Sequence, residues 1–188
     1  MPTSDTPTTA SRSPSLGEGG SFPIYRTHHL TYLSLLIAIS LSLFVLEGLL
    51  PIPFLAPGAK LGLANIVTVF ALYACTSHDA LAVILMRIAL ASLFGGGPTV
   101  FFYSLAGGLL SLVGMAALKK TGRFSLPAVS AAGGFCHHVG QLCAAVVLTG
   151  TPSLFTYLAL LGPIGLATGL ATGFIAAAVR RRAAQFFA

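Results

Sequence analysis

Seven polar side chains stand inside or beside long apolar runs of this sequence: Glu47, Lys60, Asn65, Arg87, Ser104, His137 and Gln141. They supply one carboxylate, two cations and four groups able to form neutral hydrogen bonds. An ionised side chain at the centre of a bilayer costs about 2.5 to 3.5 kcal/mol on insertion scales, so such residues usually face a cavity or one another. We therefore expect these seven side chains to form a binding site for an acidic or zwitterionic small molecule.

The stretch "FLAPGAKLGLAN", residues 54–65, places two of these side chains after a segment rich in Pro and Gly. Lys60 and Asn65 enter at the amino end of the next apolar run, where free backbone N–H groups favour anions. Glu47 could instead form a structural ion pair with Lys60. Arg87 is too deep in its run to reach water easily, which favours a cavity role for it.

The composition indicates an integral membrane protein. Of 188 residues, 55% are hydrophobic and 7% are charged, and the mean hydropathy is +0.90. Ten Lys and Arg against four Asp and Glu give a net charge of +6. The basic residues cluster beside apolar runs, a pattern that sets topology and contacts anionic lipids and argues against nucleic-acid binding.

The apolar pattern predicts an all-α bundle of six transmembrane helices over residues 30–182, with a disordered tail at 1–29 and a short C-terminal tail at 183–188. The expected spans are Leu30–Leu50, Leu61–Thr76, Asp79–Phe94, Pro98–Leu118, Leu126–Thr149 and Ser153–Val179. The second and third are short for a hydrocarbon core of about 30 Å. Short spans next to Gly and Pro are typical of transporter binding sites, although a thinned bilayer also accommodates them.

Six spans place both termini on one side of the membrane. Eight basic residues lie on that side: Arg12, Arg26, Lys119, Lys120, Arg123, Arg180, Arg181 and Arg182. Lys60 alone lies on the other side. The positive-inside rule therefore predicts a multi-pass protein of the cell membrane with both termini in the cytoplasm.

Neither a metal site nor an enzyme active site is expected. His137 and His138 are adjacent on a predicted helix and point about 100° apart, so they cannot readily bind one ion with Cys136. The sequence has no paired carboxylates, no credible nucleophile with a base and no phosphate-binding loop. We expect no catalysis and no cofactor, and any process driven by ATP that involves this chain would need separate ATPase partners.

Three runs give a resemblance to a known family: "LEGLLPIPFLAPGAKLGLANIVTVFALY", "MRIALASLFGGGPTVFFYSLAGGLLS" and "HHVGQL". They resemble the Gx transporter family, often labelled heptaprenyl diphosphate synthase component I. That family is similar in fold to the substrate-binding S components of energy-coupling-factor transporters, which have six helices and a ligand pocket in the outer half. The positions that the resemblance implies are the seven polar residues above together with Pro57, Gly58 and Gly62. One departure is His138, where the family commonly has Asn.

The resemblance also implies a partner-binding face. S components dock a shared membrane subunit through small residues of their first helix, and the matching face here is formed by Ser34, Ala38 and Ser42. Packing of this face on the glycines of the last span, Gly165, Gly169 and Gly173, is an equally good geometric match.

The synthase label suggests a second interpretation of the sequence. Prenyl diphosphate synthases bind Mg²⁺ through aspartate-rich motifs, but this chain has only Asp5 and Asp79. The label therefore fits only a non-catalytic membrane component associated with heptaprenyl diphosphate synthesis. Copurification of ATPases or of a synthase would separate the two interpretations.

Overall fold

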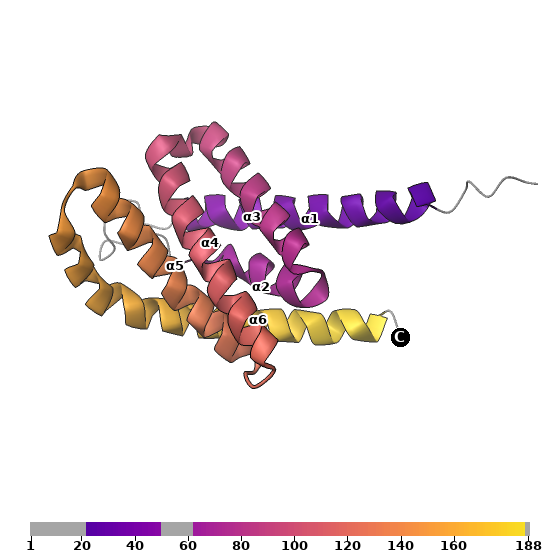
Figure 1. Cartoon of the computed structure of the whole chain (residues 1–188). Coiled ribbons are helices and arrows are strands. Elements are labelled where there is room, and N and C mark those ends of the chain that lie inside the picture. Colours follow the sequence, from indigo (N-terminus) through magenta and orange to yellow (C-terminus); the bar gives the residue numbers. More distant parts are fainter. Residues whose placement is uncertain (1–21, 50–61, 187–188) are drawn as a thin grey trace, which may run out of the picture.

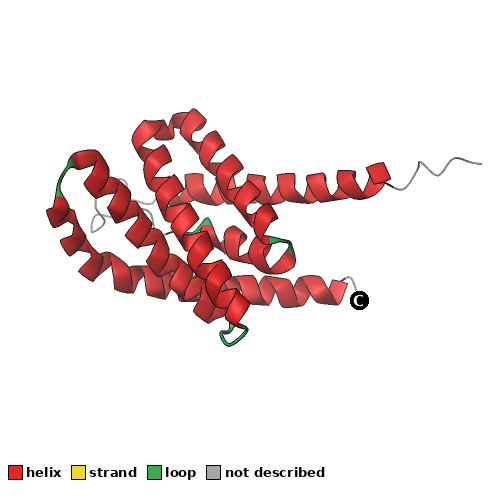
Figure 2. Cartoon of the chain, in the orientation of Figure 1, coloured by secondary structure: helices red, strands yellow, loops and turns green. Residues whose placement is uncertain are grey.

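The computed structural model describes residues 22–49 and 62–186, which form helices joined by short turns (Figure 2). The α-helices are α1 (Phe22–Leu49), α2 (Asn65–Ala74), α3 (Ser77–Ala91), α4 (Gly97–Thr121), α5 (Leu126–Thr149) and α6 (Leu158–Phe186). A π-helical turn, η1 (Ser92–Gly96), precedes α4, and a 3-10 segment, η2 (Pro152–Tyr157), precedes α6. Five helical stretches are long and apolar enough to cross a bilayer. The expected all-α, multi-pass membrane architecture is therefore confirmed.

The second expected span differs from the structure. Instead of a helix over 61–76, α2 has 10 residues and a length of about 15 Å, half of a bilayer core. The other differences concern helix ends. Helix α1 begins at Phe22, inside the expected tail, and α6 continues to Phe186, beyond the expected boundary at residue 182.

Side-chain contacts tie the start of α1 to the start of α3. His29 Nε2 lies 3.2 Å from Asp79 Oδ1. The same aspartate completes a capping box, in which the Thr76 hydroxyl accepts from the Asp79 N–H and the Thr76 N–H donates to Asp79. This reciprocal pairing satisfies two backbone donors at the helix terminus. The junction between α2 and α3 therefore lies beside the beginning of α1.

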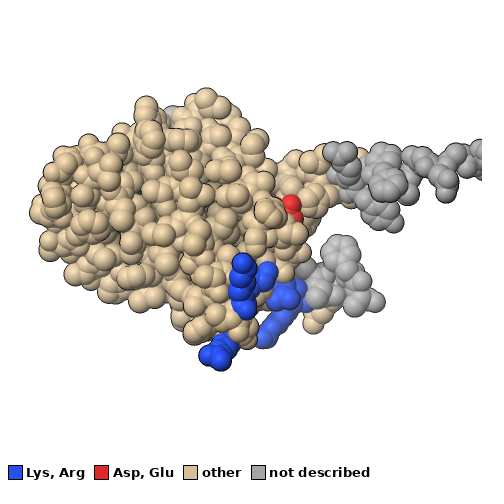
Figure 3. All heavy atoms as spheres, viewed as in Figure 1, with Lys and Arg blue, Asp and Glu red and all other residues tan. Residues whose placement is uncertain are grey.

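The ends of α4 and α6 meet the same junction. Lys119 Nζ donates to the Leu72 carbonyl and lies 5.0 Å from the centre of the Tyr73 ring. The Arg180 guanidinium lies 5.6 Å from the same ring. Lys and Arg atoms gather at this end on the face shown in Figure 3. We call it the basic end, defined by Lys119, Lys120, Arg123, Arg180, Arg181 and Arg182.

Glycines allow α5 to approach both α4 and α6 closely (Figure 1). A Cβ atom added to Gly140 of α5 would lie 2.5 Å from the Ala106 carbonyl oxygen of α4. A Cβ on Gly169 of α6 would lie 2.5 Å from the Ser130 carbonyl oxygen of α5. Ser130 and Thr172 also share a hydrogen bond of 3.1 Å. Backbone contact of this kind requires small residues at helix interfaces.

Helix α1 lies at the periphery and packs on α2 and α3. Its buried residues recur every three or four positions: Leu36, Ser40, Phe44 and Glu47. Ser34, Ala38 and Ser42 are exposed on a different face. Among the described residues, α1 makes no contact with α6. The alternative in which this small-residue face packs on the glycines of α6 is therefore wrong for the isolated chain.

Candidate functional site

A small cavity of about 10 Å³ lies among helices α1, α3, α4 and α5 and the turn that precedes α2. Its lining residues are Phe44, Glu47, Gly62, Arg87, Ser104, His137 and Gln141. A space of this size holds about one water molecule. Five of the seven residues that the sequence singled out thus converge here from four helices, although they are separated by up to ninety-four positions in the chain.

Glu47 lies near the end of α1 and is 4% exposed. Its two carboxylate oxygens accept hydrogen bonds from the Gly62 N–H at 2.6 Å and the Leu63 N–H at 3.1 Å. Inside a membrane, backbone that is not helical must find such partners within the protein. Glu47 therefore stabilises the irregular backbone that leads into α2, and its negative charge suits the amino end of that helix.

Arg87 lies on the buried face of α3, which also carries Ala80, Ile84 and Ala91 at helical spacing. Arg87 is 3% exposed, and its Nε and Nη2 atoms have no hydrogen-bond partner among the described residues. The Phe44 ring centre lies 5.9 Å from the guanidinium carbon, within the range of a cation–π contact. A buried guanidinium with unused donors is costly on its own, which makes it a strong site for an anionic group.

His137 and Gln141 lie one turn apart on α5, so both reach the same cavity. A Cβ atom on Gly107 of α4 would lie 2.9 Å from the His137 imidazole, so this glycine makes room for the ring. His138 turns the other way and packs against Gly165 of α6. The two imidazole centres are 6.0 Å apart, and the rings make an angle of 70°.

Asn65 occupies a structural position beside the cavity. It is 5% exposed, and its Nδ2 donates to the Ser111 hydroxyl at 3.2 Å. Its backbone N–H donates to the Gly62 carbonyl at 2.8 Å, and Gly62 has φ +84°, a conformation that favours glycine. Asn65 thus fixes the start of α2 against the middle of α4. Lys60, Pro57 and Gly58 lie outside the described residues.

Sequence reasoning missed Phe44 as a cavity residue. Its position three residues before Glu47 puts both side chains on one helix face, and this spacing was the available signal. An aromatic residue in an apolar run is usually packing, so the spacing alone did not distinguish it.

The cavity contains one carboxylate and one guanidinium, and the two differ in their hydrogen bonding. The Glu47 carboxylate is bonded to two backbone N–H groups, whereas the Arg87 guanidinium retains two nitrogens without partners. Ser104, His137 and Gln141 add neutral groups that could fix the orientation of a ligand.

Comparison with protein families identifies one match. The model of the family described as "Heptaprenyl diphosphate synthase component I" matches residues 36–179. Comparison with curated proteins and with solved structures finds no match. The matched region includes all of the cavity residues.

Proposed function

This chain belongs to the heptaprenyl diphosphate synthase component I family, and we propose that it is the substrate-binding membrane subunit of an uptake transporter, similar to energy-coupling-factor S components. The ligand is a small acidic or zwitterionic molecule bound at the cavity around Arg87. The buried guanidinium with two unpartnered nitrogens is the observation that supports this proposal. An outer-half position is supported by the lining of the cavity, to which no residue of the basic end contributes.

A binding role fits the family description better than catalysis does. Among the described residues the carboxylates are Glu47, inside the bundle, and Asp79, paired with His29 at the α3 start. Prenyl transfer needs several carboxylates around Mg²⁺ and a diphosphate. If the family name reflects isoprenoid or quinone side-chain synthesis, this chain contributes a non-catalytic membrane component to it.

A ligand larger than one water molecule requires the cavity to widen. Phe44 is the side chain best placed for this, because it is apolar, lines the cavity and contacts Arg87. Rotation of its ring would release the guanidinium to an incoming carboxylate or phosphate. Ligand binding would then replace a cation–π contact with charge-assisted hydrogen bonds, which are stronger.

We propose that the basic end faces the cytoplasm, with both termini on that side. The contacts of His29 and Arg180 with the α2–α3 junction support it, since they place the α1 start and the α6 end together. In a background without the native cysteines, an impermeant thiol reagent applied outside cells should label Thr151→Cys and spare Thr121→Cys. Both positions are exposed. Labelling of Thr121→Cys alone would show that the basic end faces the outside of the cell.

We further propose that the exposed face of Ser34, Ala38 and Ser42 docks a membrane-spanning coupling subunit that recruits ATPases. The Ser34 and Ser42 hydroxyls donate to carbonyls of their own helix, at 2.9 Å each, which leaves a smooth face of small side chains. Ala38→Leu should leave the thermal stability of the isolated chain unchanged, because no neighbouring helix covers this face. The same substitution should reduce recovery of the complex by about tenfold, because the larger side chain holds the partner helix away.

The matched control is Ile39→Ala, an exposed position of the same helix whose side chain points about 100° away from that of Ala38. Copurification of the native chain from its own membranes, with mass spectrometry of proteins and of retained small molecules, tests the proposed function itself. Recovery of ATPase subunits and an anionic metabolite supports transport. Recovery of a prenyl diphosphate synthase without ATPases, or an Ala38→Leu complex of normal yield, would contradict these proposals.

A further inference from the structure

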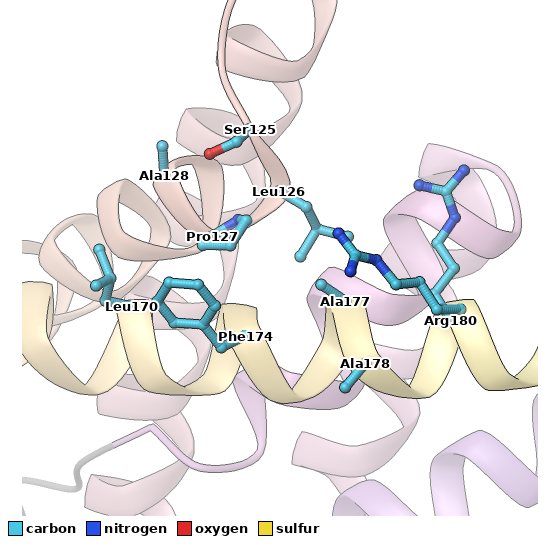
Figure 4. Close-up of a pocket in the computed structure, with 10 residues that line it drawn as sticks. Ser125, Leu126, Pro127, Ala128, Leu170, Phe174, Ala177, Ala178 and Arg180 are labelled. Atoms are coloured by element: carbon cyan, nitrogen blue, oxygen red, sulfur yellow. The ribbon is translucent and has the colours of Figure 1, made fainter.

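An open groove of about 880 Å³ lies at the basic end, between the start of α5 and the last turns of α6. Figure 4 shows the residues that line it, with Pro127 beside Phe174 and Leu126 beside Ala177. Leu170 is 43% exposed and Phe174 is 59% exposed. The groove therefore has an apolar floor that is uncovered in the isolated chain.

The polar boundary of the groove is positively charged. Arg180 and Arg181 line it, and both are exposed. No Asp or Glu follows Asp79 anywhere in the sequence, so no carboxylate from α4, α5 or α6 can neutralise these arginines. The Arg180 guanidinium lies over the face of the Tyr73 ring, and within the described ranges 22–49 and 62–186 it forms no salt bridge.

We propose that this groove binds an anionic phospholipid, with the phosphate at Arg180 and Arg181 and an acyl chain along Leu170 and Phe174. The apolar floor and the arginines follow each other along α6, in the order that a lipid presents its chains and headgroup at the edge of a bilayer. Basic pockets between helices at the cytoplasmic boundary suit such headgroups. This groove is separate from the Arg87 cavity, with which it shares no lining residue.

The test uses the purified full chain in vesicles of equal parts phosphatidylglycerol and phosphatidylcholine. After re-extraction in detergent, the lipid retained per protein is quantified by mass spectrometry. The native chain should retain phosphatidylglycerol in preference to phosphatidylcholine. The double variant Arg180→Gln/Arg181→Gln should retain about tenfold less phosphatidylglycerol than the native chain. Each basic side chain near an anionic lipid raises the affinity several-fold.

The control Lys120→Gln/Arg123→Gln removes the same charge from the same end but leaves the groove intact, and it should retain lipid like the native chain. Arg181→Gln alone keeps the Arg180 contact with Tyr73 and should show an intermediate loss, which separates lipid binding from a folding defect. Equal loss in the two double variants, or no lipid preference in the native chain, would overturn the proposal.

Two other occupants predict different results. If a soluble anion fills the groove, inorganic phosphate should bind the native chain but not the Arg180→Gln/Arg181→Gln variant, and Phe174→Ala should leave lipid retention unchanged. If a second copy of the chain fills it, the native protein should be a dimer that the Arg180→Gln/Arg181→Gln substitutions dissociate without changing lipid retention. Either result would refute lipid binding, for which Phe174→Ala lowers retention.

Discussion

Replacing Arg87 with methionine is expected to reduce ligand retention by at least about a hundredfold, because at least two charge-assisted hydrogen bonds to the ligand are lost. The folded protein should tolerate the change. Methionine is shorter than arginine, but it keeps a flexible apolar stem and removes the unpartnered Nε and Nη2 donors from the bundle interior. Glu47 keeps its bonds to the Gly62 and Leu63 N–H groups, so its carboxylate is not left without partners.

The measurement compares small molecules retained by the purified native chain and by Arg87→Met, together with their thermal unfolding midpoints. Arg123→Met is the matched control, since it removes an exposed arginine of the basic end. Arg87→Lys should recover part of the retention, because it restores the charge but not the forked donor geometry. If Arg87→Met retains as much ligand as the native chain, Arg87 is not part of the binding site.

Replacing Gly134 with alanine should destabilise the protein strongly, because α5 and α6 touch through their backbones at this position. The new Cβ would meet the Gly165 carbonyl of α6 and would lie 3.1 Å from the Gly169 Cα. Both neighbours are backbone atoms, so no side-chain rotation can relieve the overlap, and α5 must move away from α6. We expect a loss of about 3 kcal/mol in the free energy of unfolding.

Gly162→Ala provides the control on the facing helix. Its Cβ would lie 3.1 Å from Phe135 Cε2, the far end of a side chain that can shift. The Gly162→Ala substitution should lower the free energy of unfolding only slightly, because the better helix propensity of alanine partly offsets the tight contact. The two variants are compared by thermal unfolding in the same detergent. Equal midpoints would show that the backbone contact between α5 and α6 does not limit stability.

The sequence predicted the membrane class, the helical architecture and most of the cavity, because each rests on a local pattern. Long apolar runs define α3 to α6. A polar residue inside such a run usually faces the interior of the bundle, because exposure to lipid is costly. Arg87, Ser104, His137 and Gln141 could therefore be assigned to one cavity without any knowledge of the packing.

Partners in space could not be read from the sequence. The hydrogen bonds that the Glu47 carboxylate accepts from backbone N–H groups fifteen and sixteen residues away could not be foreseen, and its expected alternative partner, Lys60, lies outside the described residues. The length of α2 was overestimated because residues 61–64 are as apolar as a helix, while the positive φ of Gly62 and the Asn65–Ser111 bond place the helix start at Asn65. Apolarity reports burial, and the hydrogen bonds decide where a helix begins.

The ten-residue length of α2 also has a consequence for biogenesis. A segment of about half a bilayer cannot enter the membrane as an independent span when it leaves the translocation channel. Its two free ends would expose backbone to lipid until α3 has been synthesised. Helices α2 and α3 therefore enter as one hairpin, closed by the capping box of Thr76 and Asp79. Asn65 can form its hydrogen bond to Ser111 only later, after the ribosome has synthesised that part of α4.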